Sequence, residues 1–83
     1  MQIRWTKHAE ERQQQWQQKL DITREEIEAI LTNPQQIITE DNALIAQSIR
    51  GNGLLRIVFA DFGDTQKIIT LYWTKQISRY WQE

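Results

Sequence analysis

The spacing of apolar residues changes twice along the chain. At residues 1–5, Ile3 and Trp5 alternate with polar neighbours, which predicts a short first strand. Between residues 6 and 33 the apolar residues recur three, four or seven positions apart, as in amphipathic helices. From residue 35 onward the alternation returns. The pattern therefore predicts one strand, two helices and then a run of strands.

The starts of both helices are marked by threonine. Thr6 precedes the first helical stretch and is a favourable N-cap. Thr23 and Glu26 have the T-x-x-E spacing of a capping box, so we expect the second helix to begin at Thr23. Asn33-Pro34 ends it. We interpret the glutamines between residues 13 and 18 as a solvated face of the first helix, since glutamine is a fair helix former.

The second half of the chain consists of extended stretches joined by turns. Gly51-Asn52-Gly53 predicts a tight hairpin with Asn-Gly at its tip. The extended stretches are the short piece Ile37-Ile38 and residues 44–50, 54–60 and 66–73. We predict an α+β domain of order β-α-α-β-β-β, in which a helical hairpin packs on a twisted antiparallel sheet.

Length and composition limit the classes of protein. The 83 residues are enough for a single domain, which we place at 1–83. The chain has no cysteine and one histidine, which excludes a disulfide framework and predicts neither a metal site nor a cofactor. No stretch approaches the roughly 18 apolar residues of a membrane span, and the first residues lack an apolar signal core. We therefore expect a cytoplasmic protein without membrane contact.

The net charge of −1 conceals an uneven distribution of charged residues. Residues 20–41 carry one arginine against six acidic residues, a net charge of −5. The stretches before and after it, residues 1–19 and 42–83, are each weakly basic. A local basic surface that attracts phosphate is therefore compatible with the slightly negative net charge of the chain.

His8 and Arg12 form the first candidate site. They lie four residues apart on the predicted first helix, so their side chains share one face. Histidine can move a proton near neutral pH and arginine can hold a phosphate with two hydrogen bonds, which suits phosphodiester chemistry. Such a pair can equally close a helix onto a neighbouring strand, so both interpretations stay open.

Cations and aromatic residues form two further candidates. Arg56 lies on the face of residues 54–60 opposite Leu55, Ile57 and Phe59 and is either an exposed residue of the sheet or a ligand for an anion. The tail from Lys75 to Trp81 interleaves two cations with two aromatic residues, which suits phosphate contact and base stacking. The same tail could instead anchor a final helical turn to the core.

Several of these stretches together resemble a family of small bacterial and archaeal domains of uncharacterised function, which is similar to the RelE/ParE toxin superfamily of type II toxin–antitoxin systems. The resemblance is carried by an H-A-x-x-R motif, by I-T-R-E-E-I leading to N-P, and by a terminal R-Y-W. In this chain these motifs lie at residues 8–12, 22–27, 33–34 and 79–81. The resemblance implies a helical hairpin against a twisted antiparallel sheet.

The resemblance also implies an activity and partners. RelE-like members cut messenger RNA on the ribosome, whereas ParE-like members act on gyrase, so the two expectations are an endoribonuclease and a non-catalytic interaction module. The first makes mRNA or the ribosome the target, and either implies a cognate antitoxin protein; a homodimer stays open. The first helix is about one turn longer than is usual in that family. The residues implied for catalysis are His8, Arg12, Arg56, Arg79 and Tyr80, and those for RNA binding are Lys7 and Lys75.

Overall fold

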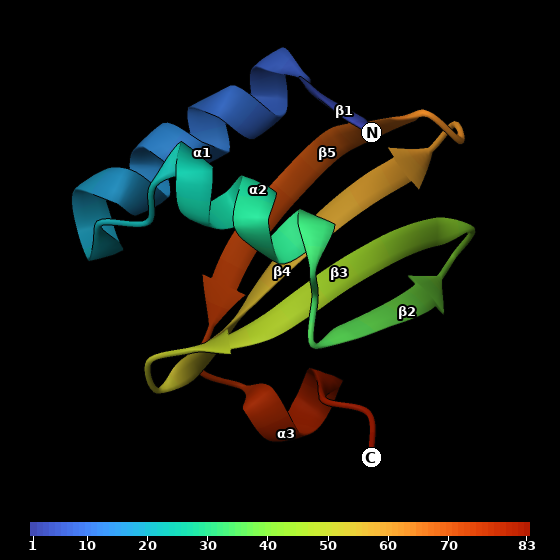
Figure 1. Cartoon of the computed structure of the whole chain (residues 1–83). Helices are drawn as coiled ribbons and strands as arrows, with labels where there is room; N and C mark the ends of the chain where they lie inside the picture. The colour runs from blue at the N-terminus through green and yellow to red at the C-terminus, as the bar shows by residue number, and fades with distance from the viewer.

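A five-stranded mixed sheet with two helices on one of its faces makes up the α+β fold (Figure 1). The computed structural model describes all 83 residues. Its elements in chain order are β1 (Gln2–Trp5), α1 (Lys7–Leu20), α2 (Arg24–Thr32), β2 (Gln36–Glu40), β3 (Ala43–Arg50), β4 (Gly53–Asp61), β5 (Thr65–Thr74) and the short α3 (Ile77–Tyr80).

The sheet has the strand order β1-β5-β4-β3-β2. Strands β2 to β5 form an antiparallel meander, but β1 pairs parallel to β5 at the edge. The prediction of a wholly antiparallel sheet was therefore wrong for β1. The short piece at Ile37-Ile38 also proves to be a full edge strand, so four strands follow the helices rather than three. Alternation indicates which face of the sheet a side chain takes, but it does not indicate whether the neighbouring strand runs parallel or antiparallel.

Both predicted helix starts are confirmed. The Thr6 hydroxyl accepts a hydrogen bond from the Ala9 amide at 3.0 Å, and the Thr23 hydroxyl accepts one from the Glu26 amide at 3.1 Å. The second half of the capping box differs from expectation. The Glu26 carboxylate accepts from Arg50 Nε at 2.9 Å and so ties α2 to the end of β3.

One residue of the glutamine tract is not solvated, contrary to our prediction. Gln13 is buried on the inner side of α1. Its amide donates to the Ile22 carbonyl at 3.0 Å and to Gln17 Oε1 at 2.6 Å. A polar side chain with the length of glutamine can reach into the core from a helix if its donors find partners there. Gln13 thereby fixes the connection between the two helices.

The core lies between the helices and one face of the sheet, which we call the inner face; the opposite face is the outer face. Leu55, Ile57 and Phe59 of β4 point inward, as predicted, and Arg56 points outward. The core cluster consists of Ala9, Ile22, Ile27, Leu31, Ala46, Leu55, Ile57, Phe59, Ile68 and Leu71. Apart from α3 at one end, no helix covers the outer face.

The β3–β4 hairpin turns one residue earlier than expected. Arg50 pairs with Gly53, so the two-residue loop is Gly51-Asn52, with Gly51 at φ +63°. A positive φ at the first loop residue favours glycine there. Gly53 is the first residue of β4 and lies against the Trp73 ring. Gly53 is thus required because a side chain there would not fit beside Trp73, and not because of the backbone conformation of the turn.

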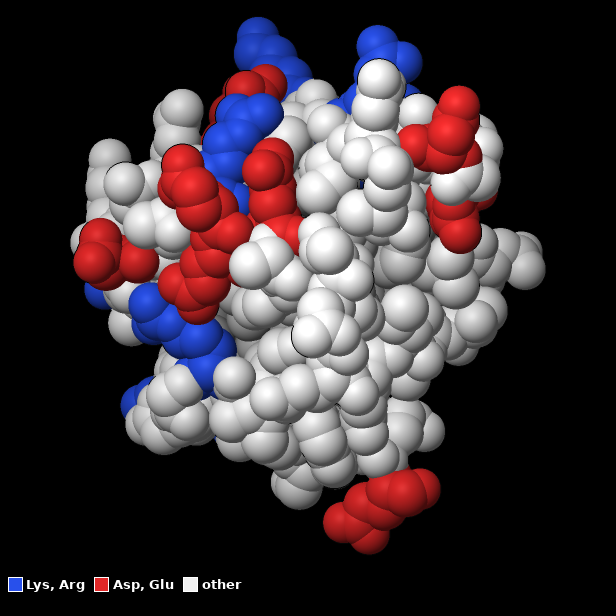
Figure 2. Space-filling view, viewed as in Figure 1, with Lys and Arg blue, Asp and Glu red and all other residues white.

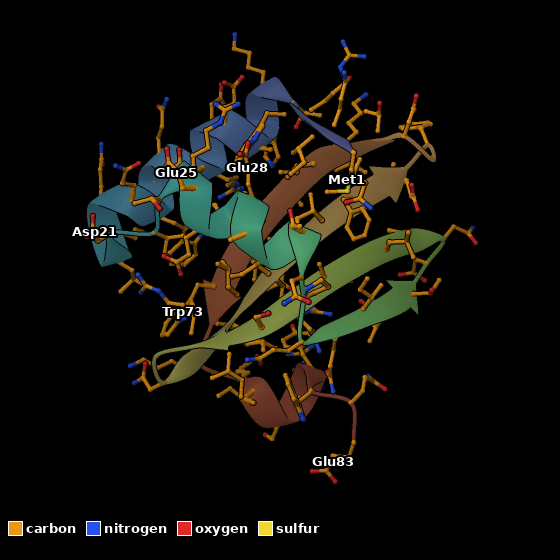
Figure 3. The ribbon with its side chains drawn as sticks, in the orientation of Figure 1. Met1, Asp21, Glu25, Glu28, Trp73 and Glu83 are labelled. Carbon is orange, nitrogen blue, oxygen red and sulfur yellow. The ribbon has the colours of Figure 1, made fainter.

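The outer surface of the helix pair carries paired charges. Arg24 contacts Glu10 at 3.3 Å and Glu28 at 3.7 Å, and Glu28 also accepts from the Trp5 indole at 2.8 Å. Figure 2 shows blue and red atoms side by side over α1 and α2, and Figure 3 shows Glu28 between the two helices. Of the six acidic residues between positions 20 and 41, Glu26, Glu28 and Glu40 form ion pairs with arginines. None of the helices combines the length and the apolar character needed to cross a membrane.

Candidate nucleic-acid interface

The predicted site residues fall into two groups on opposite faces of the sheet. Lys7, His8 and Arg12 lie on α1, which packs on the inner face, and all three are exposed. Arg12 Nη1 donates to Gln15 Oε1 at 3.3 Å, and no hydrogen bond or ion pair joins His8 to Arg12. The other group, Arg56, Arg79 and Tyr80 with nearby Lys75, lies at the outer face and the chain end. The structure thus does not bring His8 and Arg12 to Arg56.

Arg56 is buried, at 1% exposed, beneath α3. Its Nε donates to Gln47 Oε1 at 2.9 Å, its Nη1 donates to the Tyr72 hydroxyl, and its Nη2 approaches Glu40 Oε2 at 3.4 Å. The Tyr80 ring lies over the guanidinium, with its centroid 4.0 Å from Cζ. The interpretation of Arg56 as an exposed sheet residue was wrong, because no local pattern in the sequence indicates that α3 folds back over it.

Two glutamines connect Arg56 to the tail. Gln47, fully buried in β3, donates to Gln36 Oε1 at 2.7 Å and to the Tyr80 carbonyl at 3.0 Å. Gln36 Oε1 also accepts from the Gln82 amide at 3.0 Å. These bonds hold the tail against β2 and β3. Figure 1 shows α3 at the lower end of the sheet, away from α1 and α2. The tail thus supplies a partner to each glutamine, the Tyr80 carbonyl to Gln47 and the Gln82 amide to Gln36.

Tyr72 has a shifted pKa. Burial raises the pKa of its phenol above the ordinary value, and the hydrogen bond and charge of Arg56 only partly oppose that rise. The Tyr72 ring meets the Tyr80 ring edge to face, with centroids 6.4 Å apart. Tyr72 therefore keeps its proton throughout the neutral range and can act as a hydrogen-bond donor.

The raised pKa of Tyr72 predicts a loss of stability at alkaline pH. The folded state binds the phenolic proton more tightly than the unfolded state, so the contribution of Tyr72 is complete below its unfolded pKa of about 10 and falls as pH rises beyond it. Chemical unfolding between neutral pH and pH above about 10 should show a steeper decline for the native chain than for Tyr72→Phe. Equal declines in the two proteins would contradict the assignment.

Arg79 is the accessible cation near Arg56, Tyr72 and Tyr80. It is exposed on α3, its guanidinium lies 5.3 Å from the Tyr80 ring centroid, and its Nη1 donates to Gln76 Oε1 at 3.4 Å. No carboxylate pairs with it, whereas the carboxylate next to Arg56 is the half-exposed Glu40. Two guanidiniums and two phenols close together form a set of donors suited to a phosphate group. No group of three or more histidine or acidic side chains is placed to hold a metal ion.

Comparison with known proteins gives a family match. The family model described as a domain of unknown function, DUF4258, matches residues 5–73, which run from the end of β1 through most of β5. The match includes Arg56 and Tyr72 and ends before Lys75, Arg79 and Tyr80. No curated protein and no solved structure matches the chain.

Proposed function

We propose that this chain, which belongs to the DUF4258 family, is a RelE-like toxin domain that cleaves RNA. The observation that supports this proposal is the arginine–tyrosine cluster of the outer face, Arg56 with Tyr72 and Tyr80, beside the unpaired Arg79. We define these four residues as the arginine–tyrosine cluster. A toxin of this kind acts on mRNA in the cytoplasm, alone or at the ribosome, and is held inactive by a cognate antitoxin protein.

The geometry suggests separate roles in RNA cleavage for the residues of this cluster. Arg79 is accessible and would contact the RNA phosphate first. Arg56 would add its charge only where α3 shifts, because Tyr80 covers its guanidinium. The Tyr80 ring lies near both guanidiniums, 4.0 Å from Arg56 Cζ and 5.3 Å from Arg79 Cζ, so Tyr80 rather than His8 would assist proton transfer at a phosphate bound there. His8 and Arg12, on the opposite face, would contact other parts of a target.

Cleavage of a labelled RNA by the purified protein tests this assignment. We expect Arg79→Ala/Tyr80→Phe to lower the cleavage rate by about 100-fold or more, since loss of a positioned proton donor has that size. His8→Ala/Arg12→Ala should keep most of the activity, and the exposed Lys19→Ala serves as the charge control. Absence of cleavage and of growth arrest on induced expression would reject the ribonuclease, whereas a loss confined to the His8/Arg12 variant would reject the assignment of catalysis to the arginine–tyrosine cluster.

A non-catalytic interaction module is the second candidate. It is favoured by the buried state of Arg56, since each of the three guanidinium nitrogens has an acceptor within the chain. Such a module would need exposed aromatic anchors, but the four tryptophans are only partly exposed. Trp16 is half-buried and packs edge to face on Trp73 at 6.5 Å between ring centroids. Capture of a stable protein partner by a protein that leaves RNA intact would favour this module.

A further inference from the structure

A second group of cations lies at the other end of the outer face. Arg4 of β1 and Lys67 of β5 are direct partners in the parallel ladder, so neighbouring strands bring them side by side. Both alternate with core residues and therefore point outward. With Thr65 and Phe62 they line a hollow of about 310 Å³. We call these four residues the edge pocket.

The two cations of the edge pocket are not neutralised by ion pairs. Four ion pairs occur in the chain, and neither Arg4 nor Lys67 takes part in any of them. The nearby carboxylates serve the turn itself: Asp61 accepts from the Gly63 amide at 2.9 Å, and Asp64 accepts from the Thr65 hydroxyl at 3.4 Å. Because no ion pair neutralises the two adjacent cations, an anion bound between them would be attracted by both.

Phe62 gives the pocket an aromatic wall. Its side chain is 66% exposed, although its backbone is held in the β4–β5 turn by a hydrogen bond from its amide to the Thr65 carbonyl at 2.9 Å. Figure 1 shows this turn close to the N-terminal end of β1, where the Gln2 amide donates to the Asp64 carbonyl at 2.8 Å. An exposed ring on a fixed turn offers a surface on which a base can stack at little entropic cost.

We propose that the edge pocket is a nucleotide subsite for single-stranded RNA, in which a phosphate lies between Arg4 and Lys67 and the neighbouring base stacks on Phe62. This inference rests on the proposed action on RNA and extends it. The register shift opposite Val58 and Phe59 adds one residue to β5, so Lys67 and Tyr72 lie on the same face of that strand. They are about 16 Å apart along it, counted at the usual rise per residue. One extended strand of RNA thus contacts the pocket and the arginine–tyrosine cluster together.

Fluorescence anisotropy with a labelled oligouridine RNA of about 12 nucleotides tests the subsite over a series of salt concentrations. Each phosphate that is no longer neutralised lowers the salt slope of single-strand binding by about 0.7, so Arg4→Gln/Lys67→Gln, which loses the one phosphate held between the two cations, should lower it by about 0.7. Phe62→Ala should weaken binding about fivefold or more with the slope unchanged. The control, Lys19→Gln/Arg24→Gln, removes the same charge from the helical side and should keep nearly the native slope.

The outcomes separate this inference from the proposed activity. If the native chain binds RNA with the expected slopes but does not cleave it, the subsite stands and the ribonuclease fails. If the chain cleaves RNA while Arg4→Gln/Lys67→Gln keeps the native affinity and slope, the subsite is overturned and the ribonuclease stands. No measurable binding at low salt also overturns the subsite. All three residues are exposed, so matching thermal unfolding of the variants confirms that a change in binding is local.

Discussion

Gly53→Ala should destabilise the protein by about 3 kcal/mol, the upper part of the range for inserting volume into a packed site. A Cβ at Gly53 would clash with the Trp73 indole and would lie 2.6 Å from the Thr74 carbonyl oxygen. The carbonyl belongs to the backbone of β5 and cannot turn aside. The indole is also held, because its Nε1 donates to the Arg50 carbonyl at 3.0 Å and its ring packs on Trp16.

Urea unfolding measures this effect, with Gly51→Ala as the matched control. Gly51 has a positive φ, but a Cβ there would have no other atom within 4 Å, so alanine costs only the strain of the turn, about 1 kcal/mol. Figure 3 shows Trp73 below the end of α1, where the ring joins the hairpin to the helix. Adding Trp73→Leu to Gly53→Ala should recover part of the loss. Equal costs at the two glycines would contradict the close approach.

Local signals in the sequence predicted much of the fold. Thr6 and Thr23 marked both helix starts because a cap acts within four residues. The alternation over residues 54–60 assigned the two faces of β4 for a similar reason, since the period depends only on the strand itself. Features that act over a few residues can therefore be predicted without the tertiary structure.

Features that depend on distant segments were not predictable in this way. The parallel pairing of β1 with β5 joins residues more than 60 positions apart. Gly53 owes its role to a ring from another strand, and Gln13 and Gln47 owe their burial to carbonyls of a helix connection and of the tail. The predicted site residues lie on two faces of the sheet for the same reason. The i, i+4 spacing put His8 and Arg12 on one helix but could not tell which side of the sheet that helix covers.

The burial of Arg56 leads to the second large expected effect. Arg56→Met should destabilise the chain by about 3 kcal/mol, because removing one partner from a buried polar network leaves the others unsatisfied. Gln47 Oε1 and the Tyr72 hydroxyl would lose their donor, and Tyr80 would lose the cation beneath its ring. Arg56→Lys should cost less stability than Arg56→Met because it keeps the charge. It should still destabilise the chain, because a lysine cannot reach Gln47, Tyr72 and Glu40 together.

Urea unfolding of Arg56→Met, with Arg79→Met as the exposed control, measures the change in stability, and hydrogen exchange at residues 77–80 measures the hold on α3. Arg79 is exposed and pairs with no carboxylate, so its replacement should change stability by no more than about 0.5 kcal/mol. Faster exchange in α3 for Arg56→Met but not for Arg79→Met identifies the buried guanidinium as the group that holds the tail. Unchanged stability and exchange in Arg56→Met would mean that the apolar contacts of α3 hold the tail without it, and that Arg56 is free to serve a ligand.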